Sequence, residues 1–404
     1  VKRNNMYQHT HKKDIENVLI LQGGGSLGAF TCGVFKAFAK KEIKFDIISG
    51  TSIGAINGAI AVGSKNDNPV KDLEDFWIEL AESSLNIIPD MFSFDYDNQT
   101  HQMNFKRSSS ASLNAAIFGV PKFFVPRWFN YWNVFQYNNL HDFNMLPSNC
   151  TYVYDNTPLE KTLEKYIDFK KLSPNVKRNN IKNKNDKDDD HRSISNTRLV
   201  ITAVDVLTAE PIIFDSYKTQ IKMKHILATI GYPQYGFPWV DIDDGMYAWD
   251  GSLLSNTPIR EVMAVSPSND KNIFIVENYP KKIDKLPTNM TEVQSRAKDI
   301  MFTDKDLSLR KMSRLITKHI NLIEILYNVF KEHDHSKLNK DIINYIEKEH
   351  KLLVEKFGAK ILNIKRISRD NIGTPYPSQN ADFSVITIKE FITQGENKAL
   401  TILT

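Results

Sequence analysis

The feature that most constrains this sequence is a pair of similar segments between residues 18 and 61. Each begins with a short apolar run typical of a buried strand, at residues 18–22 and 45–49, and each run ends in a glycine-rich turn. Small and apolar residues at helical spacing follow each turn. Glycine permits the sharp reversal from strand into helix because it has no Cβ to collide with neighbouring backbone. The order strand, turn, helix, repeated twice, predicts an α/β fold.

The second turn reads Gly50-Thr51-Ser52-Ile53-Gly54, the G-x-S-x-G pattern of a nucleophile elbow. In such an elbow the glycines let the chain reverse while the serine hydroxyl stands exposed at the tip. The pattern alone also occurs by chance. Here an apolar run precedes it, and alanine and isoleucine follow at helical intervals. We therefore interpret Ser52 as a nucleophile rather than as a structural turn residue.

The first turn, Gly23-Gly24-Gly25-Ser26-Leu27-Gly28, has three interpretations. It matches the dinucleotide-binding fingerprint, with Asp46 near the spacing expected of a ribose-binding acid. It could equally be a tight turn without a ligand. In the third interpretation its backbone N–H groups, with the N-terminal end of the helix dipole, bind the oxyanion of a tetrahedral intermediate. We favour the third, because Asp46 stands at the start of its strand whereas a ribose-binding acid belongs at the carboxyl end.

These two turns, followed by Asp250-Gly251-Ser252, resemble the patatin-like phospholipase family in kind and in order. The tail of the chain is similar to the uncharacterised C-terminal helical domain of one bacterial and archaeal-type branch of that family. The resemblance implies a three-layer α/β/α fold with a central, mostly parallel sheet and a mainly helical C-terminal region. It also implies hydrolysis of phospholipid, lysophospholipid or related acyl esters, without a cofactor or a metal.

The resemblance further implies a role for individual residues. Ser52 would be the nucleophile and Asp250 the base of a two-residue catalytic pair. The oxyanion hole would be formed by the amides of Gly23, Gly24, Gly25 and Ile53, and the motif glycines would be Gly28, Gly50, Gly54 and Gly251. A carboxylate with a pKa near 4 is a weak base, so Asp250 would need a water-poor pocket that raises its pKa.

Two positions depart from the family pattern. Leu27 stands where an arginine is frequent, which removes a contact for anionic head groups, and Ser252 stands where glycine or alanine is usual. Neither departure touches Ser52 or Asp250. We therefore expect them to affect the choice of substrate more than the chemistry.

The histidines offer no convincing base for a Ser–His–Asp triad. His225 precedes Asp250, and the others considered lie in the charged helical tail, namely His319, His333, His335 and His350. A histidine on such a helix is far more often a solvated surface residue than a catalytic base. The sequence therefore favours a Ser–Asp pair.

Composition excludes several classes of protein. The chain has 404 residues, of which 41% are hydrophobic and 25% charged, which suits one large globular domain plus a smaller one. A net charge of +4 without a basic stripe does not indicate nucleic-acid binding. Cys32 and Cys150 lie far apart and indicate neither a disulfide framework nor a zinc site. With no apolar signal segment in residues 1–16 and no apolar run long enough to span a membrane, we expect a cytoplasmic location.

Changes in composition along the chain predict its domains. The expected units are a disordered tail at residues 1–17, a catalytic domain at 18–285 and a helical C-terminal domain at 286–404; the catalytic domain includes a loop-rich aromatic cap at 85–146 and a polar, disordered insertion at 174–197. The cap's apolar centre at residues 117–135 either packs over the domain or contacts a membrane, since aromatics with Lys122 and Arg127 suit the boundary between lipid and water.

Three functions remain open at this stage. The first is a serine hydrolase of acyl esters. The second is a nucleotide- or flavin-binding protein that uses residues Gly23 to Gly28, and the third is a catalytically inactive scaffold that binds lipid. The oligomeric state is not determined by any of these features.

Overall fold

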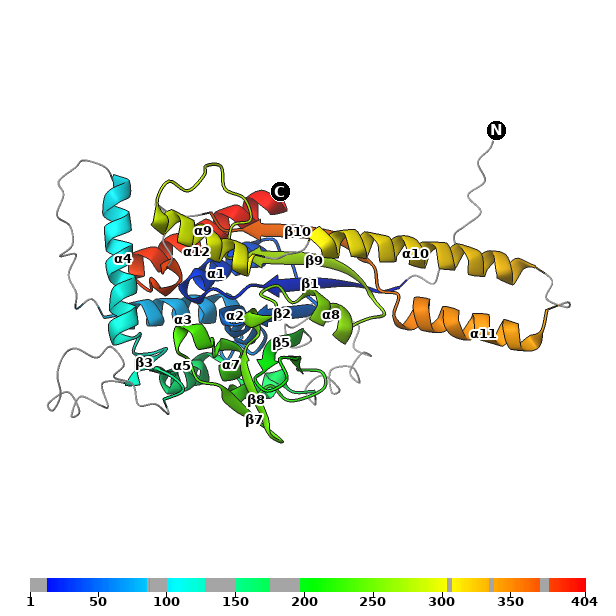
Figure 1. The fold of residues 1–404 in the computed structure, drawn as a ribbon, viewed down its shortest axis with the longest axis horizontal. Coiled ribbons are helices and arrows are strands. Elements are labelled where there is room, and N and C mark those ends of the chain that lie inside the picture. The colour runs from blue at the N-terminus through cyan, green and yellow to red at the C-terminus, as the bar shows by residue number, and fades with distance from the viewer. Residues whose placement is uncertain are drawn as a thin grey trace.

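The core of the molecule is a mixed sheet. The computed structural model describes residues 13–85, 87, 100–127, 150–174, 197–303, 307–333, 338–370 and 378–404. The strands of the sheet are β1 (Ile15–Leu21), β2 (Ile47–Thr51), β5 (Arg198–Asp205), β6 (Pro211–Asp215), β7 (Val240–Asp243), β8 (Met246–Asp250), β9 (Asp270–Glu277) and β10 (Ile361–Ser368). Their order is β10-β9-β1-β2-β5-β8-β7, and β6 pairs with β5 (Figure 1). A separate short pair joins β3 (Val125–Pro126) to β4 (Tyr154–Asp155).

The central strands are parallel and the strands at one side are antiparallel. β10, β9, β1, β2 and β5 form consecutive parallel pairs, whereas β6 and β8 run antiparallel to β5, and β7 runs antiparallel to β8. Parallel strands covered on both faces are apolar along their whole length, as in the buried run of residues 18–21. The expected mostly parallel sheet is confirmed.

Helices cover both faces of the sheet. Those of the body are α1 (Ala29–Lys40), α2 (Ile53–Val62), α3 (Pro69–Ser83), α4 (Thr100–Phe118), α5 (Thr157–Tyr166), α7 (Met223–Ile230), α8 (Ile259–Val265), α9 (Met290–Phe302) and α12 (Val385–Leu403). Successive side chains of a strand point to opposite faces. Accordingly, Leu19 and Ile48 belong to the large core with α1, α2 and α12, whereas Ile20 and Ile47 pack with α8. The result is the expected three-layer α/β/α arrangement.

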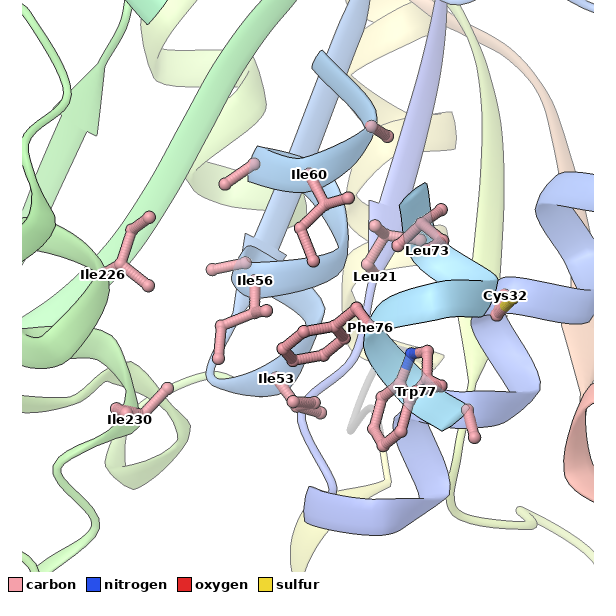
Figure 2. Packing of buried hydrophobic residues seen from close by; sticks show 14 of the residues in the cluster. Leu21, Cys32, Ile53, Ile56, Ile60, Leu73, Phe76, Trp77, Ile226 and Ile230 are labelled. Carbon is pink, nitrogen blue, oxygen red and sulfur yellow. The ribbon is translucent and has the colours of Figure 1, made fainter. Parts of the chain in front are cut away.

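The helix α2 is held tightly in the larger layer. Ile53, Ile56 and Ile60 pack between Phe76 of α3 on one side and the α7 side chains on the other (Figure 2). Polar contacts inside this layer are also satisfied. Trp77 Nε1 donates to Asn57 Oδ1 at 3.0 Å, and Asn57 Nδ2 donates to the carbonyl of Gly28 at 3.0 Å. These bonds tie α2 and α3 to the first glycine-rich turn.

The C-terminal helix α12 packs against α1 at very short range. A Cβ built on Gly33 of α1 would lie 1.8 Å from the carbonyl oxygen of Ile392, and one built on Gly395 would lie 2.0 Å from that of Phe30. Only glycine at both positions allows the two backbones to approach this closely. The C-terminal helix is therefore part of the main core.

This packing joins the predicted C-terminal domain to the core of the preceding residues. Residues 286–404 are mainly helical, as predicted, but β10 extends the central sheet beside β9 and α12 covers that sheet. The projecting part of the C-terminal region is the pair α10 (Leu307–Glu332) and α11 (Lys340–His350), which extends away from the sheet (Figure 1).

Several local predictions can be compared with the structure. Apolar residues at helical spacing predict a helix at residues 70–84, and a proline in the first turn predicts another at 157–166; the structure has α3 and α5 there. The sequence predicts a loop-rich cap, but part of the cap is the helix α4, which spans Thr100–Phe118. Its sequence has no apolar stripe, so hydrophobic periodicity could not reveal it. β1 begins at Ile15, within the expected tail.

Other expectations fall outside the described residues. These are most of the tail, at residues 1–12, most of the insertion, at 175–196, and much of the cap, at 86, 88–99 and 128–149. Among the described residues, none of the helices combines the length and apolar character needed to cross a bilayer.

Candidate active site

Both glycine-rich turns lie at the carboxyl edge of the sheet. The first follows β1 and the second follows β2, and these strands are parallel neighbours that pair Leu21 with Gly50. Parallel neighbours bring their carboxyl ends to the same edge, which is where ligands bind in open α/β sheets. The two turns, separated by more than twenty residues in sequence, therefore lie side by side.

Ser52 has an unusual backbone conformation in the second turn. It joins β2 directly to α2 with φ 56° and ψ −132°, a region that costs a non-glycine residue about 1 to 3 kcal/mol. The flanking glycines make this reversal possible, because a Cβ on Gly50 would lie 2.5 Å from the Gly54 carbonyl and one on Gly54 would lie 2.3 Å from the Leu21 carbonyl. The Ser52 side chain remains half-buried and faces a cavity.

Asp250 ends β8 next to the second turn. Its side chain is 2% exposed, and burial raises the pKa of its carboxyl to about 6. Hydrogen bonds from the Ser52 side chain and from the Ser252 backbone, the latter 2.8 Å from Oδ1, act in the opposite direction because they stabilise the charged form. Sequence reasoning thus placed Ser52 and Asp250 together, and the structure brings them into contact from strands on either side of β5.

Asn256 connects the Asp250 loop to the first turn. Its Oδ1 accepts hydrogen bonds from the Gly23 N–H at 2.9 Å and from Ser252 Oγ at 3.2 Å. Its Nδ2 donates to the carbonyl of Phe302 at 3.1 Å. The amide of Gly23, which is expected to be an oxyanion donor, thus bonds Asn256 in this structure and holds the first turn against it.

The other expected donors line the cavity. Gly24 and Gly25 have φ values of 152° and 57°, so the turn adopts backbone conformations that favour glycine. Ile53 is the first residue of α2, and the first N–H groups of a helix have no acceptor within that helix. The amides of Gly24, Gly25 and Ile53 therefore belong to the wall that also carries Ser52.

The cavity in front of these residues has a volume of about 640 Å³ and a mainly apolar lining that includes several aromatic side chains. The aromatic side chains come from the cap, from β4, from the segment between α7 and β7, from the residues just after β9 and from the C-terminal region. They are Phe123, Phe124, Tyr154, Tyr232, Tyr235, Phe237, Tyr279, Phe302 and Phe383. A volume of this size can hold a ligand of several tens of atoms, and its apolar lining suits a hydrocarbon chain.

Sequence reasoning missed three residues that position the site. Thr229 Oγ1 accepts the Ser52 N–H at 2.9 Å and donates to the carbonyl of Thr202 at 2.6 Å, which fixes the second turn. Asn278 Nδ2 donates to the carbonyls of Gln22 and Gly23. Asn256 and Asn278 each stand at a strand or loop end on the carboxyl edge, a position that could have signalled them. Thr229 carries no such signal, because it lies inside a helix.

The structure also shows where His225 and Asp46 lie, the residues that a catalytic triad or a nucleotide site would use. His225 stacks on Phe214 with 4.3 Å between ring centroids, and burial lowers its pKa to about 4. No histidine is among the described residues that line the cavity. Asp46 precedes β2 at the opposite edge of the sheet, where it accepts the Asn17 N–H at 2.8 Å. It cannot serve as the acid of a nucleotide site at the carboxyl edge.

The fold and this edge define the class of protein. The chain is a three-layer α/β protein in which two glycine-rich turns and an aspartate meet at the carboxyl ends of the strands. Residues 19–263, more than half of the chain, match the family described as patatin-like phospholipase. The chain therefore belongs to the patatin-like phospholipase family.

Similarity to individual proteins covers short segments. The chain is 30% identical over 74 residues to the putative patatin-like phospholipase domain-containing protein M110.7 of Caenorhabditis elegans, which is 18% of this chain and 7% of that protein. It is 36% identical over 73 residues to patatin-like phospholipase domain-containing protein 7 of Rattus norvegicus, or 18% of this chain and 5% of that protein. It is 55% identical over 42 residues to lysophospholipase nte1 of Aspergillus terreus, or 10% of this chain and 3% of that protein.

Among solved structures, VipD from Legionella pneumophila matches with a TM-score of 0.35 and 12% identity, covering 98% of this chain and 71% of that one.

Proposed function

We propose that this protein is a serine hydrolase of lipid acyl esters. The observation that carries the proposal is the contact between Ser52, in its strained turn, and the buried carboxyl of Asp250 at the wall of an apolar cavity. Serine needs a partner that takes its proton before it can attack a carbonyl. A carboxylate whose pKa is raised to about 6 by burial is a better base than an exposed one and is still ionised at neutral pH.

The reaction would proceed in two steps. Ser52 Oγ attacks the ester carbonyl while Asp250 takes its proton, and the N–H groups of Gly24, Gly25 and Ile53 stabilise the negative oxygen. Asp250 then passes the proton to the leaving alcohol, which leaves an acyl group on Ser52. Water, activated by Asp250, releases the fatty acid by the same path in reverse.

The cavity supports a lipid substrate. Its aromatic side chains can hold an acyl chain next to Ser52, and the three relatives carry the words phospholipase or lysophospholipase in their names. We propose that phospholipids or lysophospholipids are the substrates. The described part of the expected membrane contact ends at Arg127; within it Phe123 and Phe124 line this cavity as buried side chains, so contact with a lipid surface stays a prediction for the rest of that segment.

Labelling with a fluorophosphonate probe tests the nucleophile. The wild-type protein should be labelled on Ser52, as located by mass spectrometry of the digested protein, and should hydrolyse a short-chain ester. Ser52→Ala should abolish both. The matched control is Ser83→Ala, since Ser83 is a serine of α3 whose hydroxyl bonds the Leu80 carbonyl and is remote from the cavity.

The alternatives give different results in the same preparation. Labelling at any residue other than Ser52 would contradict the proposal. Absence of labelling together with lipid binding would favour an inactive scaffold. A co-purified nucleotide or flavin without labelling would favour the cofactor-binding interpretation.

A further inference from the structure

The cavity contains a second charged group that the proposed reaction does not use. Among the described residues that line it, Asp250 and Lys298 are the charged ones. Lys298 comes from α9, beyond residues 19–263 that match the family. The C-terminal region of this chain therefore supplies a cation to the site formed by the family's characteristic turns.

The ammonium group of Lys298 is held in place by Asn380 and Tyr235. Its Nζ donates to Asn380 Oδ1 at 2.6 Å and lies 5.0 Å from the centroid of the Tyr235 ring. Burial lowers the pKa of this amine to about 8, an effect that the adjacent Asp299 partly offsets. Burial raises the pKa of the Asp299 carboxyl, and its Oδ2 lies 3.9 Å from Arg296 Nη1. At neutral pH Lys298 is thus a partly desolvated cation.

Lys298 and Asn380 lie beside the first glycine-rich turn. The short helical turn Gln379–Ala381 packs directly on it, since a Cβ on Gly25 would lie 2.3 Å from the Asn380 carbonyl oxygen. Ser26 Oγ also donates to the carbonyl of Gln379 at 3.1 Å. Through Asn380, the cation is therefore next to the turn that carries the proposed oxyanion donors Gly24 and Gly25.

We propose that Lys298 and Asn380 form a subsite for the phosphate of a phospholipid head group. The inference rests on the proposed function, because it assigns one end of the substrate of that same site. One of the three N–H donors of the Lys298 ammonium group bonds Asn380 Oδ1, which orients it, and the amide of Asn380 carries N–H groups of its own. Both side chains therefore have N–H groups of the kind that bind phosphate oxygens. Charge-assisted bonds of this kind are stronger in a cavity of low polarity than in water.

The subsite would orient the substrate. With the phosphate at Lys298, the ester carbonyl reaches the amides of the first turn, and the acyl chain enters the aromatic part of the cavity. Neutral glycerides lack the phosphate and would bind without this contact. The protein should therefore prefer anionic phospholipid substrates to neutral esters with the same acyl chain.

The test compares two substrates that share an oleoyl chain. Lysophosphatidylglycerol carries a phosphodiester with one negative charge, and monooleoylglycerol carries none. In the wild-type protein kcat/KM should be higher for the phosphodiester. Lys298→Met should lower the ratio of the two kcat/KM values about tenfold or more, mainly through KM, and Lys298→Arg should keep most of the preference.

Controls separate the subsite from the fold and from the reaction. Lys285→Met removes the same charge from an exposed position just before α9 and should keep the wild-type ratio. Fluorophosphonate labelling counts the competent active sites in each variant, and Lys298→Gln provides a polar substitute if the methionine variant folds poorly. Failure of the wild-type protein to cleave any ester would contradict the proposed function, whereas cleavage with an unchanged ratio in both Lys298 variants would overturn only the subsite.

Inorganic phosphate distinguishes a lipid head group from a free anion. Competition by phosphate against lysophosphatidylglycerol in the wild-type protein, and its loss in Lys298→Met, would support the head-group subsite. An effect of phosphate that depends on Lys298, combined with an unchanged substrate ratio, would assign the position to a free anion and overturn the proposal.

Discussion

At the scale of single residues, the proposed reaction depends on the protonation of Asp250. In that proposal its carboxyl must be ionised to accept the Ser52 proton, and burial places its pKa at about 6. The same burial disfavours the ionised form in the folded state. The carboxyl that we propose as the base therefore lowers the stability of the fold at neutral pH, because its charged form is buried. Such a cost is typical of functional sites.

The first prediction concerns the pH dependence of the reaction. In the wild-type protein kcat/KM should rise about tenfold per pH unit below pH 6, because only the ionised carboxylate acts as a base, and should level off above about pH 7. Steady-state hydrolysis of a neutral short-chain ester between pH 4.5 and 8 measures it. A profile without a limb near pH 6 would assign the proton transfer to another group.

The second prediction concerns the stability of Asp250→Asn. The pKa of Asp250 is higher in the folded chain than in the unfolded one, so its proton stabilises the fold below about pH 4 and this stabilisation is lost as the pH rises through about 6. Asparagine can keep the bond from the Ser252 N–H without the buried charge. At pH 7.5 the variant should therefore be more stable than the wild type by roughly 2 to 3 kcal/mol, although hydrolysis falls by at least about a hundredfold.

Urea unfolding at pH 7.5 and pH 4 measures this difference. The gain in the free energy of unfolding should shrink toward zero at pH 4, where both proteins carry a neutral side chain at position 250. Equal stability of the two proteins at pH 7.5 would show that the ionised carboxylate is better solvated than its burial indicates.

At the scale of the elements, the junction between β2 and α2 depends on close backbone packing. The α2 helix begins directly after Ser52 and passes over the end of β1, so Gly54 lies against the Leu21 carbonyl. Further along the same helix, Gly58 faces the side chains of Ile48 and Leu199 instead, at 3.1 Å. Backbone cannot move aside as a side chain can. The two glycines of one helix should therefore tolerate substitution very differently.

The third prediction uses this contrast. Gly54→Ala should lower the free energy of unfolding by about 3 kcal/mol or more, because a Cβ 2.3 Å from a backbone oxygen forces the helix away from the strand. Gly58→Ala should change it by no more than about 1 kcal/mol, since alanine's helix propensity offsets a mild overpacking. Urea unfolding and fluorophosphonate labelling would be measured on both. Similar losses in the two variants would mean that the strand–helix junction is not the sensitive point.

At the scale of the whole molecule, the C-terminal region completes the core that begins at β1. β10 pairs with β9 along seven residue pairs, and α12 covers α1 through the two glycine contacts. The same region supplies Lys298, Phe302, Asn380 and Phe383 to the cavity. The fold and the site therefore both depend on residues beyond the segment that matches the family.

The fourth prediction concerns truncation. A chain ending at residue 285 should not fold to a packed state, because it loses β10 and exposes the α1 surface that α12 buries. Near-ultraviolet circular dichroism and binding of a hydrophobic dye would detect the loss of packing. The control replaces residues 328–349 with a short Gly/Ser linker. A short linker can join the two ends, because the rings of Tyr327 and His350 stack with 3.6 Å between their centroids. That deletion removes mainly exposed helix and should keep the fold; a stable, labelled 1–285 chain would contradict the prediction.

The sequence by itself determined the local features of this protein. Strand, glycine turn and helix are encoded within about thirty residues, so the α/β class, Ser52, the first turn and the α3 and α5 helices could be predicted from periodicity and from glycine chemistry. Asp250 could be named because a motif carries it. The α4 helix could not, since it lacks an apolar stripe.

Only the tertiary structure decided which distant groups meet. The use of the Gly23 amide by Asn256, the support of Ser52 by Thr229, and the entry of Lys298 into the cavity each join residues far apart in the chain. The same holds for the place of β10 in the sheet. The hydrophobic pattern of a segment indicates whether that segment is buried. It does not indicate which other segment it packs against, because any apolar surface can cover an apolar face. The partners are selected by packing of the whole core.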